Sequence, residues 1–359
     1  MTKEIRCFGC GAIIQSEDEK KIGFVPKNAL EKDVILCKRC FRLKNYHELQ
    51  KTDLTSDDFL KILQEIGNHD CLVVYLVDLF DYNGSLINGL SRHLNNNDIL
   101  VLGNKRDILP KSLKDRKIEH WLRRQLKESG IKPIDVILSS GTKNYNLDLL
   151  IDKINEYRHG RDVYIVGVTN VGKSSLINSL LKHYAGVTDN LITTSEFPGT
   201  TLDLIEIPLY DSPGIINNHQ MAHLVKDEDL RIIIPKSELR PINFQLNDQQ
   251  TLYFGGLARV DFIKGPRSSF TCFFPKLLKI HRTKLGNSDN LYNRHLTLMP
   301  EIESIKDINE MASYDFKLPE GKIDIVISGL GFVSVNCPNA NVRVHAPQGV
   351  GVFIREALI

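Results

Sequence analysis

The chain has 359 residues, enough for two or three domains, and its 25% charged and 42% hydrophobic residues are ordinary for a globular protein. Its net charge of +2 conceals an uneven distribution, because residues 221–300 hold 12 Lys and Arg against 7 Asp and Glu. No apolar run approaches the ~18 residues of a membrane-spanning helix, and Cys7 lies too near the start for a signal peptide, so we expect a cytoplasmic protein that associates with no membrane.

Two Cys-x-x-Cys pairs lie near the N-terminus, with 26 residues between them. Each pair can present two thiolates to one side of a tight turn, and four thiolates form the closed tetrahedral shell that structural zinc prefers. We therefore predict a zinc-binding module over residues 1–50, with the ligands Cys7, Cys10, Cys37 and Cys40. Reduced thiols in a small core, or a redox pair, are the alternatives.

A guanine-recognition motif follows the first predicted strands of a parallel sheet. The apolar run 71–77 predicts a buried strand, a helix is expected over 85–94, and a second strand over 99–102 leads into Asn104-Lys105-Arg106-Asp107. Ligands bind at the carboxyl ends of such strands. The Asp107 carboxylate can accept two hydrogen bonds from guanine that adenine cannot donate. Asn104 can tie this loop to a neighbouring phosphate loop, and the Lys105 stem can cover the base.

The next segments continue the alternation of helix and strand. We expect an amphipathic helix over 112–129, a strand over 136–138 and a helix over 147–157. Ser139-Ser140-Gly141 directly follows that strand, where a GTPase places a loop of small residues. The backbone N–H groups of Ser139 and Ser140 are therefore candidates to bind the guanine carbonyl.

A phosphate-binding motif stands in the middle of the chain. Residues 167–174 fit the pattern G-x-x-x-x-G-K-[ST], between a predicted strand over 162–166 and a helix that starts at Ser175. Backbone N–H groups at such a helix start can bind phosphate oxygens, Lys173 can reach the terminal phosphates, and Ser174 can hold Mg²⁺. The predicted nucleotide-binding residues of this loop are Gly167, Asn170, Val171, Gly172, Lys173, Ser174 and Ser175.

Two switch motifs follow the phosphate loop, Pro198-Gly-Thr-Thr201 and Asp211-Ser-Pro-Gly214. One threonine must reach Mg²⁺ and the γ-phosphate, and we prefer Thr201 over Thr200, which remains a candidate nucleotide-binding residue. Asp211 is expected to hold Mg²⁺ through water, and the Gly214 N–H to bond the γ-phosphate. The predicted catalytic residues are Lys173, Thr201 and Gly214, and the predicted magnesium ligands are Ser174, Thr201 and Asp211. For either motif alone, a Pro-Gly turn is the alternative.

Two residues bear on the rate of hydrolysis. Ile215 stands where many GTPases carry a glutamine that orients water, and an isoleucine cannot do this by hydrogen bonding. We therefore expect slow intrinsic hydrolysis of GTP to GDP. Asn170 in the phosphate loop is a candidate ligand for K⁺, whose charge would lie beside the phosphates.

The order of these motifs is reversed. The guanine loop precedes the phosphate loop by about sixty residues, whereas in an ordinary GTPase it follows. Either one motif is chance or the domain, over residues 51–216, is circularly permuted, and the other pieces in permuted positions favour permutation. Only nine residues separate Thr201 from Asp211, where a GTPase places two antiparallel strands. Either this hairpin is drastically shortened or a loop is missing from the chain, and we favour the second interpretation.

Residues 217–359 carry no catalytic motif and predict an α+β or mostly β domain, with strand-like segments over 251–254, 270–274, 323–327 and 342–345. No acidic residue lies between Phe262 and Ser288. The basic residues there are Lys264, Arg267, Lys276, Lys279, Arg282 and Lys284, beside Phe262, Phe270, Phe273 and Phe274. These side chains predict contact with RNA phosphates and, less strongly, stacking on bases. The alternative is alternation, with Phe in the core and Lys in solvent. Cys272 and Cys337 are interpreted as core thiols.

With these motifs the chain resembles the YqeH-type circularly permuted GTPases over nearly its whole length. The resemblance is carried by the two cysteine pairs, by Asp78-Leu-Phe-Asp81-Tyr-Asn-Gly84-Ser85, and by the guanine, phosphate and switch motifs, together with residues 245–250 and 255–259. It implies GTP/GDP, Mg²⁺ and structural Zn²⁺ as ligands. It also implies a GTP-timed role in assembly of the small (30S) ribosomal subunit, with the subunit or its precursor and 16S rRNA as partners. We expect a monomer.

Two other functions remain open. The first is an RNA-binding scaffold that holds guanine nucleotide with negligible hydrolysis, which Ile215 would allow. The second is an ATPase with the same phosphate loop, and Asp107 argues against it.

Overall fold

The structure is a computed structural model that describes residues 14–17, 24–26, 30, 56–185, 200–201, 209–212, 217, 219–292, 294 and 310–359. The chain forms two compact units and passes between them more than once. The first unit comprises Met1–Val77, Ile87–Lys105 and Leu122–Ile216, and the second comprises Asp78–Leu86, Arg106–Trp121 and Asn217–Ile359. Among the described residues, no helix has both the length and the apolar character needed to cross a membrane.

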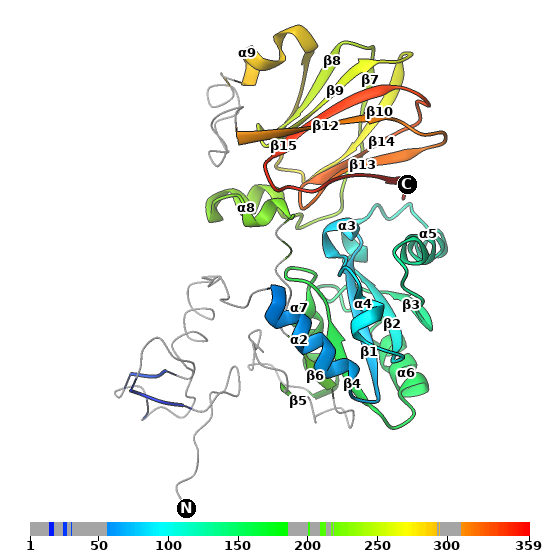
Figure 1. Cartoon of the computed structure of the whole chain (residues 1–359), viewed down its shortest axis with the longest axis vertical. Coiled ribbons are helices and arrows are strands. Elements are labelled where there is room, and N and C mark those ends of the chain that lie inside the picture. Colours follow the sequence, from blue (N-terminus) through cyan, green and yellow to red (C-terminus); the bar gives the residue numbers. More distant parts are fainter. Residues whose placement is uncertain are drawn as a thin grey trace, which may run out of the picture. The chain divides into compact units, whose positions relative to one another are not determined.

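The first unit is built on a six-stranded sheet with the order β3-β2-β1-β4-β6-β5 (Figure 1). Its strands are β1 (Cys71–Asp78), β2 (Asp98–Asn104), β3 (Asp135–Leu138), β4 (Asp162–Val166), β5 (Thr200–Thr201) and β6 (Leu209–Asp211). β1 and β6 both pair in parallel with β4, β2 pairs in parallel with β3, and β5 is antiparallel to β6. All eight residues of β1 are buried, as expected for an apolar strand inside a parallel sheet.

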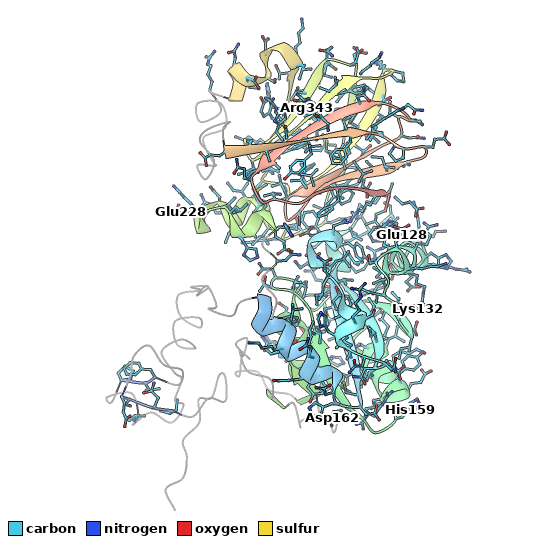
Figure 2. The ribbon with its side chains drawn as sticks, in the orientation of Figure 1. Glu128, Lys132, His159, Asp162, Glu228 and Arg343 are labelled. Carbon is cyan, nitrogen blue, oxygen red and sulfur yellow. The ribbon has the colours of Figure 1, made fainter. Side chains whose placement is uncertain are left out.

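Four of the described helices belong wholly to this unit, one before β1 and three between strands of the sheet. They are α2 (Ser56–Gly67), α4 (Leu90–His93), α6 (Leu147–Arg158) and α7 (Lys173–Ala185), while the residues of α5 (Asp115–Glu128) fall in both units. Figure 2 labels His159, just after α6, and Asp162, the first residue of β4, which together mark the amino end of β4. The phosphate loop follows the other, carboxyl end of this strand.

The helix predicted over residues 85–94 is wrong. The structure has two short helices instead, α3 (Tyr82–Ser85) and α4, with extended backbone at Leu86 and a left-handed φ of 71° at Gly89. The Tyr75 hydroxyl accepts a hydrogen bond from the Ile87 N–H at 3.1 Å. The extended backbone at Leu86 breaks the helix, and this bond satisfies the Ile87 N–H just beyond the break.

The strand order confirms the circular permutation. The strand before the phosphate loop, β4, lies in the middle of the sheet, although the strands that lead to the guanine loop come earlier in the chain. At the other edge, Thr200 pairs with Asp211 and Thr201 with Tyr210. The connection between these two strands, residues 202–208, lies outside the described residues, so the choice between a shortened hairpin and a missing loop stays a prediction.

The second unit is mostly β and contains two five-stranded sheets, in the orders β16-β13-β14-β10-β7 and β11-β8-β9-β15-β12. The strands are β7 (Ile242–Leu246), β8 (Gln250–Phe254), β9 (Ala258–Lys264), β10 (Ser268–Phe273), β11 (Ile280–Lys284), β12 (Met311–Lys317), β13 (Ile323–Ile327), β14 (Gly331–Val335), β15 (Asn341–Pro347) and β16 (Val352–Glu356). The short helices are α3, η2 (Arg106–Ile108), η4 (Met221–His223), α8 (Asp227–Ile233), η5 (Leu285–Asn287) and α9 (Ser288–Tyr292). Each of the four predicted strands overlaps a strand of this unit. One shared apolar core includes Leu252, Phe262, Phe270, Val333 and Val344.

The segment Asp78–Leu86 is held in the second unit by a buried carboxylate. Asp81 is 3% exposed and accepts hydrogen bonds from Gln220 Nε2 at 3.0 Å, Ser328 Oγ at 3.2 Å and the Gly84 N–H at 3.3 Å. Burial, and after it the neighbouring Asp78 carboxylate, raise the pKa of Asp81 to about 6. The negative charge of Asp81 is therefore unfavourable in the folded state, although three donors face it.

This pKa predicts a dependence of stability on pH. Between its ordinary value of 3.8 and about 6, folded Asp81 holds a proton that the unfolded chain has lost. The free energy of unfolding therefore falls as pH rises through this window, by at most about 3 kcal/mol, and is flat above it. Asp81→Asn should remove this component. The free energy of unfolding of the wild type minus that of the variant, measured by urea unfolding from pH 4 to pH 7.5, should therefore decline up to about pH 6 and then stay constant. The exposed Asp248→Asn is the control, and a difference that does not change with pH would contradict the prediction.

Candidate nucleotide-binding site

The phosphate loop is a tight connection between β4 and α7, and it needs glycine at its closest approaches. Gly172 has a left-handed φ of 95°, and a Cβ there would lie 2.5 Å from Asn104 Nδ2. A Cβ on Gly167 would lie 3.0 Å from the carbonyl oxygen of Leu76. The pattern of glycines is therefore required by the packing of this loop against the ends of neighbouring strands.

Lys173 begins α7 and turns back across the loop. Its side chain is buried, and Nζ donates a hydrogen bond to the Gly167 carbonyl at 2.9 Å. The 13-residue helix α7 presents its N-terminal N–H groups and the positive end of its dipole at the same loop. Ser174 is half-buried in its first turn, and Ser175 is exposed. This donor set suits phosphate oxygens.

A buried hydroxyl in the loop also fits a phosphate group. Thr169 Oγ1 is buried and has no hydrogen-bond partner among the described residues. An unpartnered buried hydroxyl is costly unless a ligand completes it. The motif pattern leaves this position free, so sequence reasoning did not single out Thr169. Asn170, the candidate K⁺ ligand, is exposed and has a φ of 64°.

Asn104 joins the guanine loop to two other loops. Its side chain is 2% exposed, and Nδ2 donates to the Val171 carbonyl in the phosphate loop at 2.8 Å. Its Oδ1 accepts hydrogen bonds from Ser139 Oγ and from the Gly141 N–H, both at 3.2 Å. The predicted tie from Asn104 to the phosphate loop is present. The second tie, to the loop that follows β3, is an additional finding.

The loop Ser139–Gly141 packs on the first turns of α7. Ser139 and Ser140 are buried, and a Cβ on Gly141 would lie 2.8 Å from the Leu176 backbone nitrogen. Ser179 Oγ donates to the Gly141 carbonyl. Nothing in the sequence distinguishes Ser179 from a solvent-facing serine of a helix, so this contact was missed.

The remaining guanine-loop residues lie where the chain changes unit. Lys105 is the last residue of its segment in the first unit and has a φ of 65°. Asp107 is half-buried in η2, within the second unit. The two residues are two positions apart in the chain, so the N-K-x-D motif spans the boundary.

The switch residues are described in part. Thr200, Thr201 and Asp211 lie in β5 and β6, and only their backbone is described. Ser212 is fixed to β4, because its N–H and Oγ donate to the Ile165 carbonyl at 3.1 and 2.8 Å. Gly214 and the predicted zinc ligands Cys7, Cys10, Cys37 and Cys40 lie outside the described residues. Within the described residues, no group of three or more His, Cys, Asp or Glu side chains could hold a metal ion.

The aromatic residues of the basic stretch are in the core of the second unit. Phe262 and Phe270 pack on each other with ring centres 5.0 Å apart, and Phe273 and Phe274 stack on Phe332 and Phe254. All four are buried, so the possible stacking of these rings on bases is wrong. The six basic side chains are all exposed, namely Lys264, Arg267, Lys276, Lys279, Arg282 and Lys284. The phenylalanines contribute to the apolar clusters of the second unit, whereas the basic residues lie at the end of β9, in β11 and outside the strands.

The remaining cysteines are core thiols. Cys71, Cys272 and Cys337 are buried and free. Burial raises the pKa of Cys71 to about 12 and that of Cys272 further still. The thiols of Cys71 and Cys272 are therefore protonated at neutral pH and unsuited to bind metal.

A phosphate loop on the central strand of a parallel sheet, preceded in the chain by a guanine-recognition motif, defines a circularly permuted P-loop GTPase. Comparisons with known proteins agree. Residues 162–251 match the family described as 50S ribosome-binding GTPase, and residues 267–358 match the family described as YqeH-like, C-terminal.

The relatives extend the match over the whole chain. Uncharacterized protein YqeH of Bacillus subtilis (strain 168) is 53% identical over 366 residues, which cover 99% of this chain and 100% of the relative. NO-associated protein 1 of Arabidopsis thaliana is 27% identical, and the match covers 98% of this chain and 76% of the relative. Nitric oxide-associated protein 1 of Homo sapiens is 23% identical, and the match covers 99% of this chain and 75% of the relative. The chain belongs to the YqeH family of GTPases, which confirms the resemblance inferred from the motifs.

Asn104→Ala tests the connection between the loops. The variant loses all three hydrogen bonds of this side chain and leaves buried partners unsatisfied, so we expect GDP affinity to fall about tenfold and stability by about 1–3 kcal/mol. Isothermal titration calorimetry and urea unfolding measure the two effects. Asn68→Ala, at an exposed position just after α2, is the matched control. Wild-type GDP affinity in the Asn104 variant would contradict the assigned role.

Proposed function

We propose that this GTPase is a GTP-timed factor in assembly of the small (30S) ribosomal subunit, which contacts 16S rRNA and hydrolyses GTP slowly. The observation that carries its nucleotide chemistry is the hydrogen bond from Asn104 to the phosphate loop, at 2.8 Å. It joins the motif that selects guanine to the motif that binds phosphate. The exposed basic residues of the second unit support the contact with RNA.

The residues divide the work of holding the nucleotide. The N-terminus of α7, Lys173 and the Thr169 hydroxyl would bind phosphate oxygens, and Ser174, Thr201 and Asp211 would hold Mg²⁺. Bound Mg²⁺ neutralises charge on the phosphates. Gly214 would sense the γ-phosphate through its backbone N–H, and Asp107 would select guanine. Loss of the γ-phosphate would then release the switch segments, an order–disorder transition of the kind GTPases use.

Hydrolysis itself should be slow. Ile215 cannot orient a water molecule, and the positive charge that stabilises the transition state would come from Lys173 and from K⁺ held by Asn170. A hydrolysis rate that is equal in K⁺ and Na⁺ buffers would contradict the role of Asn170. A protein that binds GTP but shows no turnover in either buffer would be the RNA-binding scaffold that Ile215 also allows.

The zinc module is part of the proposal. The four cysteines Cys7, Cys10, Cys37 and Cys40 have the number and chemistry of a closed structural zinc site. Elemental analysis of the purified protein should find one zinc per chain, and none after Cys37→Ser with Cys40→Ser. A metal-free protein with unchanged stability would contradict this part.

Asp107→Asn tests base selection. The variant cannot accept both guanine hydrogen bonds, so we expect GDP affinity to fall by about 10- to 100-fold. Affinity for xanthosine diphosphate (XDP) should rise, because the asparagine N–H can donate to the carbonyl that replaces the 2-amino group of guanine. Nucleotide binding measured by calorimetry for both bases gives the ratio directly. The exposed Asp152→Asn on α6 should leave both affinities unchanged. If Asp107→Asn leaves GDP binding unaltered, the guanine-recognition role fails and an ATPase becomes the better reading.

The ribosomal role is tested by co-sedimentation. Purified 30S subunits, 50S subunits and immature small-subunit particles are each incubated with the protein in GDP or a non-hydrolysable GTP analogue, at fixed salt. We expect binding to small-subunit particles with the analogue and release with GDP. Binding that ignores the nucleotide would favour the scaffold, and binding to 50S subunits alone would overturn the choice of subunit.

A charge variant locates the RNA contact in the same assay. Replacing Lys279, Arg282 and Lys284 by Gln should weaken binding and reduce the slope of log affinity against log salt by about 2–3. The same replacement of Lys127, Lys132 and Lys143, which are exposed on the first unit, is the control for net charge. Equal effects of the two triple variants would mean that the basic stretch is not the contact surface.

A further inference from the structure

Asp107 stands in the second unit, although the strand that leads to it belongs to the first. The segment Arg106–Trp121 is grouped with Asn217–Ile359 rather than with the sheet that contains β2. The neighbouring segment Asp78–Leu86, which follows β1, is grouped in the same way. Contacts within the second unit therefore determine the local position of the residue expected to select guanine.

An apolar cluster holds the residue next to Asp107. Ile108 is 5% exposed and packs in a cluster whose other members are Phe80, Leu239, Phe273, Val326 and Phe332. Phe80 comes from the segment after β1, and the last three come from β10, β13 and β14. Side chains in such a cluster occupy defined positions, because interiors are close-packed.

The segment before β7 also binds the backbone of this loop. The Leu239 N–H donates to the Ile108 carbonyl at 2.8 Å, and Leu239 is itself 2% exposed. Its neighbour Glu238 accepts a hydrogen bond from the Lys111 N–H through Oε1, at 2.6 Å. Two consecutive residues of the second unit thus hold the chain one and four positions after Asp107.

The residue before Asp107 is fixed as well. The Arg106 guanidinium pairs with Asp115 at 2.6 Å and donates to the Leu113 carbonyl, and its side chain is 12% exposed. Farther along the segment, Trp121 Nε1 donates to the Glu356 carbonyl at 3.0 Å. Asp107 therefore lies between a paired arginine and a buried isoleucine, with little freedom of its backbone.

We infer that Leu239 and Glu238 are positioning residues for Asp107, through which the second unit sets the affinity and selectivity for guanine nucleotides. This inference rests on the proposed recognition of guanine by Asp107. It adds a route of communication that does not involve the switch motifs. Because coupling between two sites is reciprocal, a partner that shifts the segment before β7 changes guanine affinity, and bound guanine changes the affinity for that partner.

The test compares two leucines of the same unit in the full-length chain. Leu239 and Leu318 are each 2% exposed, but Leu318 packs in the separate, larger core cluster. Both Leu→Ala variants create a cavity and should lose similar stability in urea unfolding. We expect Leu239→Ala to raise the dissociation constant for GDP about tenfold and Leu318→Ala less than about twofold. Equal effects of the two variants would overturn the inference.

A double-mutant cycle with Asp107→Ala separates positioning from general damage. If Leu239 acts through Asp107, Leu239→Ala should change the GDP dissociation constant less than about twofold once Asp107 is gone. A full additional loss in that background would overturn the inference while leaving guanine recognition by Asp107 intact. If Asp107→Ala by itself leaves GDP binding unchanged, the proposed recognition of guanine fails, and the inference fails with it.

Glu238 provides a milder variant in case Leu239→Ala does not fold. Glu238→Ala removes the acceptor of the Lys111 N–H, whereas Glu238→Gln keeps an acceptor oxygen at the same place. We expect weaker GDP binding in Glu238→Ala, with selectivity for GDP over XDP reduced, and near wild-type values in Glu238→Gln. Wild-type binding and selectivity in both variants would overturn the role of Glu238.

Discussion

The parallel pairing of β1 with β4 is the constraint on which the nucleotide site depends. Cys71 lies opposite Asp162 and Tyr75 opposite Val166, so two strands about ninety residues apart in the chain run side by side. In the permuted order, the guanine half of the domain comes first and the phosphate half second. This pairing brings the carboxyl ends of both halves to one edge of the sheet, where parallel α/β sheets bind ligands.

The Asn104 side chain then joins the loops at that edge. One amide group satisfies the Val171 carbonyl and two donors of the loop after β3, in a position that is almost fully buried. Buried amides with all partners satisfied specify one arrangement of the groups around them. The three loops are therefore arranged together, and Ser179 on α7 adds a fourth contact to the same arrangement.

The second unit is more than an appended domain. It includes the segments that follow β1 and β2, so the chain leaves the first unit twice before it reaches the phosphate loop. Asp81 anchors the first segment by a costly buried carboxylate, and Ile108 anchors the second by apolar packing. A GTPase built in this way has Asp107, the residue proposed to select guanine, and its exposed basic stretch on one compact unit.

Much of the site could be predicted because its chemistry is local. The phosphate loop, the N-K-x-D motif and the apolar strands before them are contiguous, and their reversed order was enough to predict permutation. The helix expected over 85–94 failed because Leu86 takes an extended and Gly89 a left-handed backbone conformation, which the local spacing of apolar residues does not reveal. The orphan Thr169 hydroxyl and the Ser179 contact were missed because burial and partners depend on packing.

The sequence by itself therefore determined the family, the nucleotide class, the strands β1 to β4 of the first unit and four of the ten strands described in the second, since these follow from short-range patterns and residue chemistry. The tertiary structure alone decided that the phenylalanines of the basic stretch face the core. It also decided that Leu239, more than a hundred residues from Ile108, binds the backbone beside Asp107. The physical reason is that such contacts join residues far apart in the chain, and only the packed fold brings them within hydrogen-bonding and van der Waals distance.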